Sequence, residues 1–120
     1  MSLLLRRRNM VQFLNPVLVQ SKSANYNNVT SFLITPDATP TDGNLVILAY
    51  GGTQTRTAAP PSGFTQIAFS PSTGTLYLEY KIASSEPSSY TVTMSAGLQG
   101  TIQLYEFSNI DTTNPYIGAL

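Results

Sequence analysis

The side chains that most often carry out chemistry are scarce in this chain. It has no histidine and no cysteine, and its six acidic residues stand singly among 120. Activation of a nucleophile by imidazole and metal binding by thiolate or imidazole therefore have no residues to use. Acid–base work would fall to carboxylates, and a sugar-cleaving pair needs a defined separation. Glu79 and Glu106 fall in separate predicted strands, so we expect no catalytic pair, no cofactor and no enzymatic activity.

Glu106 breaks the pattern of its own segment. Strict alternation places it on the same side as the apolar residues that precede it. A buried carboxylate needs partners. We expect either a bulge that rotates the end of the strand or an ion pair with Arg56 or Lys81.

Two further kinds of binding site have candidate residues. The acidic loops 37–42 and 111–114 contain oxygen ligands of the kind that calcium accepts, but Asp and Asn in turns generally bond to their own backbone, so we predict no metal site. Seven tyrosines and five phenylalanines could include a stacking surface for a sugar. We take Tyr77 and Tyr105 as the candidate sugar contacts.

The basic residues are concentrated at the start of the chain. Arg6, Arg7 and Arg8 are half of all its lysines and arginines, and they follow three leucines. Guanidinium groups pair well with carboxylates of a partner protein, while leucines fill an apolar groove. We predict that residues 1–16 form an extended anchoring arm, with a disordered start as the alternative. The predicted partner-binding residues of this arm are Leu3, Leu4, Leu5, Arg6, Arg7, Arg8 and Phe13.

The composition of the rest is that of a β-rich protein with few charges. Only 10% of residues are charged, against about 25% in ordinary soluble domains, and the formal net charge is zero. Nothing here favours binding to nucleic acid or to a membrane. Apolar runs separated by Gly, Pro, Asn and Ser predict seven strands, at 17–21, 29–35, 45–51, 64–69, 75–83, 89–95 and 100–108.

These strands predict one all-β domain over residues 17–120, an antiparallel β-sandwich of the jelly-roll kind. In the strand at 75–83, Leu76, Leu78, Tyr80 and Ile82 are predicted to face the core, and Tyr77, Glu79 and Lys81 to face solvent. The segment LVILAY at 45–50 is apolar on both faces, so we expect protein to cover both, either in this chain or from a neighbouring subunit. The adjoining Gly51-Gly52 is expected to be a turn.

Four segments together resemble a known kind of module. They are Asp42-Gly43 before LVILAY, PPSGF at 60–64, LYLEYKIASSEPSSYTVT at 76–93 and YEFSNIDTTNP at 105–115. The sequence resembles a β-sandwich module of tailed-bacteriophage virion proteins, such as tail-fibre and other appendage components, and of phage-derived surface proteins. The resemblance covers residues 20–116. It differs at Phe64, where such modules commonly carry tryptophan.

The resemblance implies a structural protein of the virion, assembled in the host cytoplasm. We expect a tail-fibre or baseplate-associated appendage component, anchored by residues 1–16 to tail or capsid subunits. A homo-oligomer, with three copies as the natural number, would cover the two-sided strand at 45–50. The alternatives are a capsid decoration protein and a carbohydrate-binding module that recognises host-surface glycans.

Overall fold

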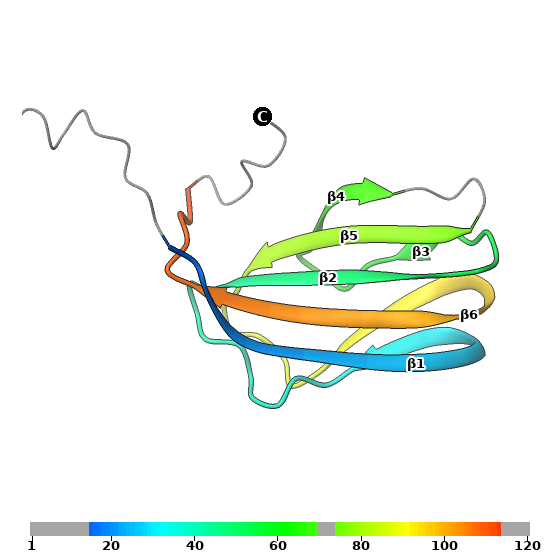
Figure 1. Cartoon of the computed structure of the whole chain (residues 1–120), viewed down its shortest axis with the longest axis horizontal. Coiled ribbons are helices and arrows are strands. Elements are labelled where there is room, and N and C mark those ends of the chain that lie inside the picture. Colours follow the sequence, from blue (N-terminus) through cyan, green and yellow to red (C-terminus); the bar gives the residue numbers. More distant parts are fainter. Residues whose placement is uncertain (1–14, 70–73, 114–120) are drawn as a thin grey trace, which may run out of the picture.

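The computed structural model describes residues 15–69 and 74–113, and all of the regular structure in them is β-strand. Every strand pairing is antiparallel, and one sheet runs in the order β1-β6-β2-β5-β4, with β3 paired to β6 (Figure 1). The all-β prediction is confirmed. The six strands are β1 (Val17–Ile34), β2 (Leu45–Gly52), β3 (Ala58–Ala59), β4 (Thr65–Phe69), β5 (Thr75–Ile82) and β6 (Tyr90–Ser108).

The two longest strands, β1 and β6, pair with each other along nearly their whole length. Each joins two segments that the sequence predicts as separate strands, which reduces the seven predicted strands to five, and the unpredicted β3 makes six in the described residues. Both turn back at the same end of the molecule (Figure 1). The bend coincides with shifts in the β1–β6 register and with Asn28, whose φ is 56°. Asparagine tolerates this left-handed conformation, so the chain bends here without ending the strand.

A single apolar core joins the two halves of the bent strands. It contains residues of β6 from both sides of its bend, residues of β1 beyond its bend and residues of β2 and β5, and Ala24 and Tyr26 from the first half of β1 pack against it. The backbone N–H of Ala58 in β3 donates to the Tyr77 hydroxyl of β5 at 3.2 Å, and the rings of Phe64 and Tyr90 meet edge to face at 5.4 Å. The buried apolar residues are Phe32, Ile34, Val46, Leu48, Tyr50, Tyr77, Ala83, Tyr90, Val92, Met94, Leu98, Ile102 and Leu104.

The entry to β2 is a tight turn, as the sequence predicts. Gly43 has a φ of 91°, a conformation that glycine adopts without steric cost. Its N–H donates to the carbonyl of Ala83 at 2.9 Å, and the N–H of Ala83 donates to the carbonyl of Asn44 at 2.8 Å. This turn fixes the register in which β2 and β5 meet.

The predicted orientation of β5 is wrong. Tyr77 and Glu79 face the core, while Leu76 is 57% exposed. In the observed register Tyr50 lies opposite Tyr77, and Leu48 lies opposite Glu79, so these residues share the buried face. The Tyr50 and Tyr77 rings stack at 5.3 Å, and the Tyr50 hydroxyl supplies a partner for the Glu79 carboxyl. Stacked aromatic burial and a hydrogen bond for Glu79 explain this orientation.

Candidate functional site

Glu79 is a fully buried carboxyl on the inner face of the sheet. The Tyr50 hydroxyl donates a hydrogen bond to its Oε2 at 2.5 Å, whereas Oε1 has no hydrogen-bond partner. Burial raises the pKa of Glu79 above its ordinary value, and the bond from Tyr50 only partly offsets this effect. Burial also raises the pKa of Tyr50, and the nearby Glu79 raises it further. Both shifts disfavour the charged forms of the two groups.

Glu106 is also buried, but donors surround it. It accepts hydrogen bonds from the Gln20 amide at 2.7 Å, the Asn44 amide at 2.7 Å and the Thr41 backbone N–H at 2.9 Å. Burial alone would raise the pKa of Glu106, but these hydrogen bonds outweigh it and lower the pKa below its ordinary value. The carboxylate thus joins β1 and the loop before β2 to β6.

Neither expected explanation accounts for Glu106. The register of β1 against β6 does shift beside Glu106, between Leu18–Phe107 and Gln20–Glu106, but the extra residue, Val19, belongs to β1. The pairing of β6 with β2 runs without a shift from Leu45–Phe107 to Gly52–Gly100, so the end of β6 is not rotated. The partners of Glu106 are amide and backbone donors in place of Arg56 or Lys81. Arg56 instead donates to the Gly97 carbonyl at 2.7 Å, and Lys81 forms an ion pair with Glu86 at 3.0 Å.

The two buried carboxyls lie apart on the inner face of the sheet. Glu79 lies opposite Leu48 and Glu106 opposite Val46, with β2 between them. Two strand spacings of about 4.8 Å and an offset of two residues put their Cα atoms roughly 12 Å apart. Each carboxyl has its own partners and is shielded from solvent, so a substrate in solution does not reach either one.

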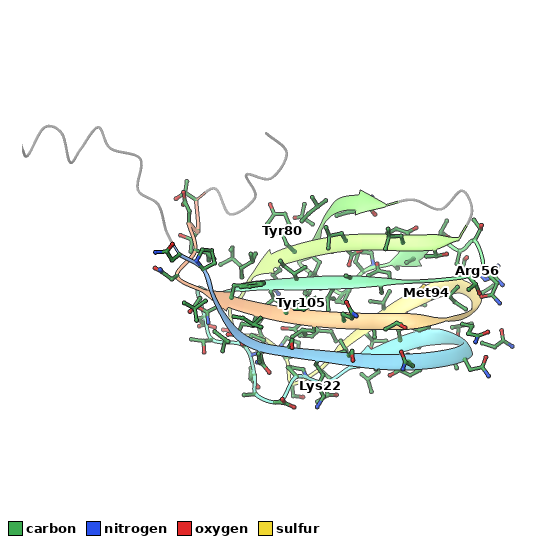
Figure 2. All side chains as sticks on the ribbon, in the orientation of Figure 1. Lys22, Arg56, Tyr80, Met94 and Tyr105 are labelled. Atoms are coloured by element: carbon green, nitrogen blue, oxygen red, sulfur yellow. The ribbon has the colours of Figure 1, made fainter. Side chains whose placement is uncertain are left out.

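The opposite, outer face of the sheet is the strongest candidate for a functional surface. In the registers of β2 with β5 and β6, the residues that alternate with the buried ones are half-buried or exposed. None of them carries a charge. Figure 2 labels Tyr80 on β5 and Tyr105 on β6, with β2 between them. The outer-face residues of the three strands are Leu45, Ile47, Ala49, Gly51, Leu76, Leu78, Tyr80, Ile82, Thr101, Gln103, Tyr105 and Phe107.

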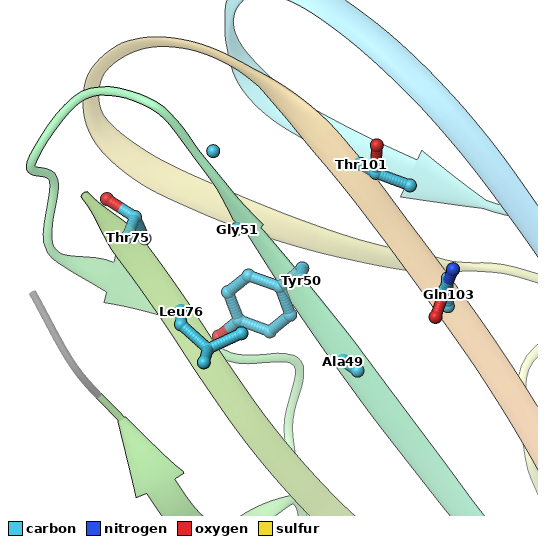
Figure 3. A pocket seen from close by; sticks show the side chains of 8 residues that line it. Ala49, Tyr50, Gly51, Thr75, Leu76, Thr101 and Gln103 are labelled. Carbon is cyan, nitrogen blue, oxygen red and sulfur yellow. The ribbon is translucent and has the colours of Figure 1, made fainter.

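A shallow hollow of about 310 Å³ lies toward one end of this face. Figure 3 shows Leu76 on one side of it, Thr101 and Gln103 on the other, and Gly51 between them. Gly51 belongs to β2 and not to the predicted turn. A Cβ at this position would lie 1.9 Å from the Thr75 carbonyl oxygen, so only glycine fits. The missing side chain leaves the floor of the hollow open beside the exposed Leu76.

The sequence-predicted site residues have different outcomes. The whole set in the arm (Leu3, Leu4, Leu5, Arg6, Arg7, Arg8 and Phe13) lies outside the described residues. Tyr77 is only 5% exposed, so the expectation that it offers its ring to a sugar is wrong. Tyr105 is half-buried on the outer face, and its hydroxyl donates to the Gln103 side chain at 2.8 Å.

The described residues contain neither a metal-binding cluster nor a membrane-spanning helix. Within residues 15–69 and 74–113, no three His, Cys, Asp or Glu side chains gather closely enough to hold a metal ion. None of the described residues forms a helix that could span a bilayer.

Comparison of the chain with models of protein families, with curated proteins and with solved structures gives no match.

Proposed function

We propose that this chain is a non-enzymatic structural protein that works by packing against other protein subunits. One observation carries the proposal: the ionisable side chains of β5 and β6 turn inward, while the outer face of these strands and of β2 is mostly apolar and carries no charge. A face of this composition suits contact with protein better than contact with water. The buried, separated carboxyls support a role without catalysis.

We further propose that these subunits belong to the virion of a tailed bacteriophage. In that virion the protein is part of a tail-fibre or baseplate-associated appendage. Support for this step comes from the sequence resemblance over residues 20–116 and from the few charges of the chain. In this proposal the bent sheet is a jelly-roll-like sandwich, and residues 1–16 are the arm that anchors it. Capsid decoration is the competing location.

Immunogold labelling of intact phage particles, with an antibody raised against the full chain, tests this proposal. Gold on tails or fibres is the expected result. Gold distributed over heads would replace the appendage with a decoration protein. Particles that carry no label, from a lysate in which the antibody detects the chain, would overturn the virion role.

The anchoring role of the arm has its own test. Replacing Arg6, Arg7 and Arg8 together by serine removes three charges that would pair with a partner's carboxylates. We expect the circular dichroism spectrum to stay that of the unmodified protein and incorporation into particles to fall at least roughly tenfold. Lys22→Ser, which removes a charge from the body, is the control and should incorporate normally. Undiminished incorporation of the triple variant would remove the arm from the proposal.

A further inference from the structure

We propose that a second copy of this chain covers the outer face of the sheet, with Leu76 of each copy seated in the glycine-floored hollow of the other. This inference rests on the proposed role in subunit packing and names both the surface and the partner.

Ionisable groups are distributed unequally between the two faces of the sheet. Glu79 and Glu106 are buried on the inner face, where burying a carboxyl has a free-energy cost that hydrogen bonds must offset. The outer face of β2, β5 and β6 carries no charge at all. Leu18, 51% exposed and paired with Phe107, adds to this apolar surface at one end of β1, whereas Ser21, Ser23 and Asn25 make the rest of that strand's outer face polar. Such a contiguous apolar surface on a small protein marks an interaction site.

The size of the face sets the strength expected of a two-copy interface. The three strands β2, β5 and β6 at about 4.8 Å spacing and eight residues at about 3.3 Å rise span roughly 14 by 26 Å, or about 370 Å² before the relief of side chains is counted. A standard stable interface buries about 800 Å² on each partner. A dimer through this face is therefore expected to be reversible and to depend on protein concentration.

The shape of the face is self-complementary. Leu76 projects beside a hollow of about 310 Å³ whose floor is Gly51 and whose far wall is Thr101 and Gln103. In a two-fold pairing the same patch of both copies is in contact. If the two-fold axis passes between Leu76 and the hollow, Leu76 of each copy lies against the hollow of the other. An uncharged face does not favour an acidic or a basic partner. The same face of a second copy is also apolar and uncharged, so the two faces are complementary in polarity.

Sedimentation equilibrium of the full chain tests the pairing. The wild-type protein is expected to approach twice its 13.0 kDa mass as its concentration rises. Leu76→Asp places a charge at two points of a two-fold interface, so it should weaken the dimer at least roughly 100-fold and leave a folded monomer.

Leu33→Asp is the matched control. Leu33 is also a strand leucine, 46% exposed, but it lies in the part of β1 beyond the bend, between the buried Phe32 and Ile34. The Leu33→Asp variant should therefore dimerise as the wild type does. Gln103→Lys, on the far wall of the hollow, is a second test variant in case Leu76→Asp does not fold.

Several results would overturn the inference. The first two are a wild-type protein that stays monomeric at all concentrations and a dimer that persists in both Leu76→Asp and Gln103→Lys. The others are a Leu33→Asp variant whose dimer is weakened as much as that of Leu76→Asp, and a species of three copies. A wild-type monomer found together with gold-labelled particles would remove this inference and keep the proposed function. A dimer broken by Leu76→Asp, together with unlabelled particles, would keep the surface and remove the virion role.

Discussion

Glu79 points to the inside of the bent sheet, and Leu76, three residues earlier in the same strand, points out. The inner face has two buried carboxyls, of which one is well supplied with donors and one has a single partner. The outer face has no charge and a half-buried apolar surface. The comparison teaches that side-chain polarity alone does not tell which face of this sheet is the core. The turn at Gly43 and the β2–β5 register decide it.

The largest expected contrast is between leucines on the two faces. Leu48→Ala removes a fully buried side chain of the core and should lower the free energy of unfolding by about 2–5 kcal/mol. Leu76→Ala should change it by less than about 0.5 kcal/mol in the separated subunit, because that side chain is already exposed. Urea denaturation at protein concentrations low enough to give monomers measures both. Equal losses would mean that the assignment of the two faces is wrong.

The next contrast is between the two buried carboxyls. Glu106→Gln brings an amide N–H₂ among three donors and should lower the free energy of unfolding by about 1–3 kcal/mol. Glu79→Gln keeps an oxygen acceptor for the Tyr50 hydroxyl and removes a carboxyl whose charged form burial already disfavours, so it should lower the free energy of unfolding less than Glu106→Gln does. Guanidinium denaturation of the two variants, compared with the wild type, measures the difference. A larger loss for Glu79→Gln would contradict the roles assigned to these groups.

The pH dependences of these two variants should run in opposite directions. The folded-state pKa of Glu79 is raised, so the wild type loses stability relative to Glu79→Gln as the pH rises above the unfolded value of about 4.3, until the folded-state pKa is passed. The folded-state pKa of Glu106 is lowered, so its contribution is lost as the pH falls below about 4.3. Unfolding curves from acidic to neutral pH test both. Parallel pH profiles for the two variants would contradict the account.

The smallest effect is expected at the edge of the sheet. Lys22 forms an ion pair with Asp37 at 2.7 Å, and both side chains are well exposed to solvent. Lys22→Ala should therefore lower the free energy of unfolding by less than about 1 kcal/mol, and added salt should reduce the difference further. Thermal unfolding at low and high salt measures it. A loss comparable to that of Glu106→Gln would show that solvent does not screen this pair.

The sequence predicts part of this fold because some signals are local. The runs of β-branched and aromatic residues locate most of the strands, and Asp42-Gly43 correctly predicts a left-handed turn. The bends in β1 and β6 are not predicted, since the residues there resemble those of a loop. They remain paired because two long strands support each other across the bend. The two-residue β3 is too short to give a pattern of its own.

The candidate surface was only partly predictable for a physical reason. Alternation shows which residues share a face, but the face that is buried depends on the partners of the strand. In β5 the sequence predicts that the face of Leu76 and Leu78 is the core. The stacking of Tyr77 on Tyr50 and the hydrogen bond from Tyr50 to Glu79 instead bury the opposite face. The two-sided apolar character of LVILAY was the one signal that pointed to cover on the outer face.

The central claim is that another copy of the chain contacts the outer face, and isotope-filtered NOE spectroscopy tests it most directly. An equimolar mixture of labelled and unlabelled protein reports only contacts between copies. We predict cross-copy NOEs from the Leu76 methyl groups to the α-protons of Gly51, and none from the methyl groups of Leu33. Cross-copy signals confined to Leu33, or their absence at concentrations where the protein is dimeric, would contradict the account.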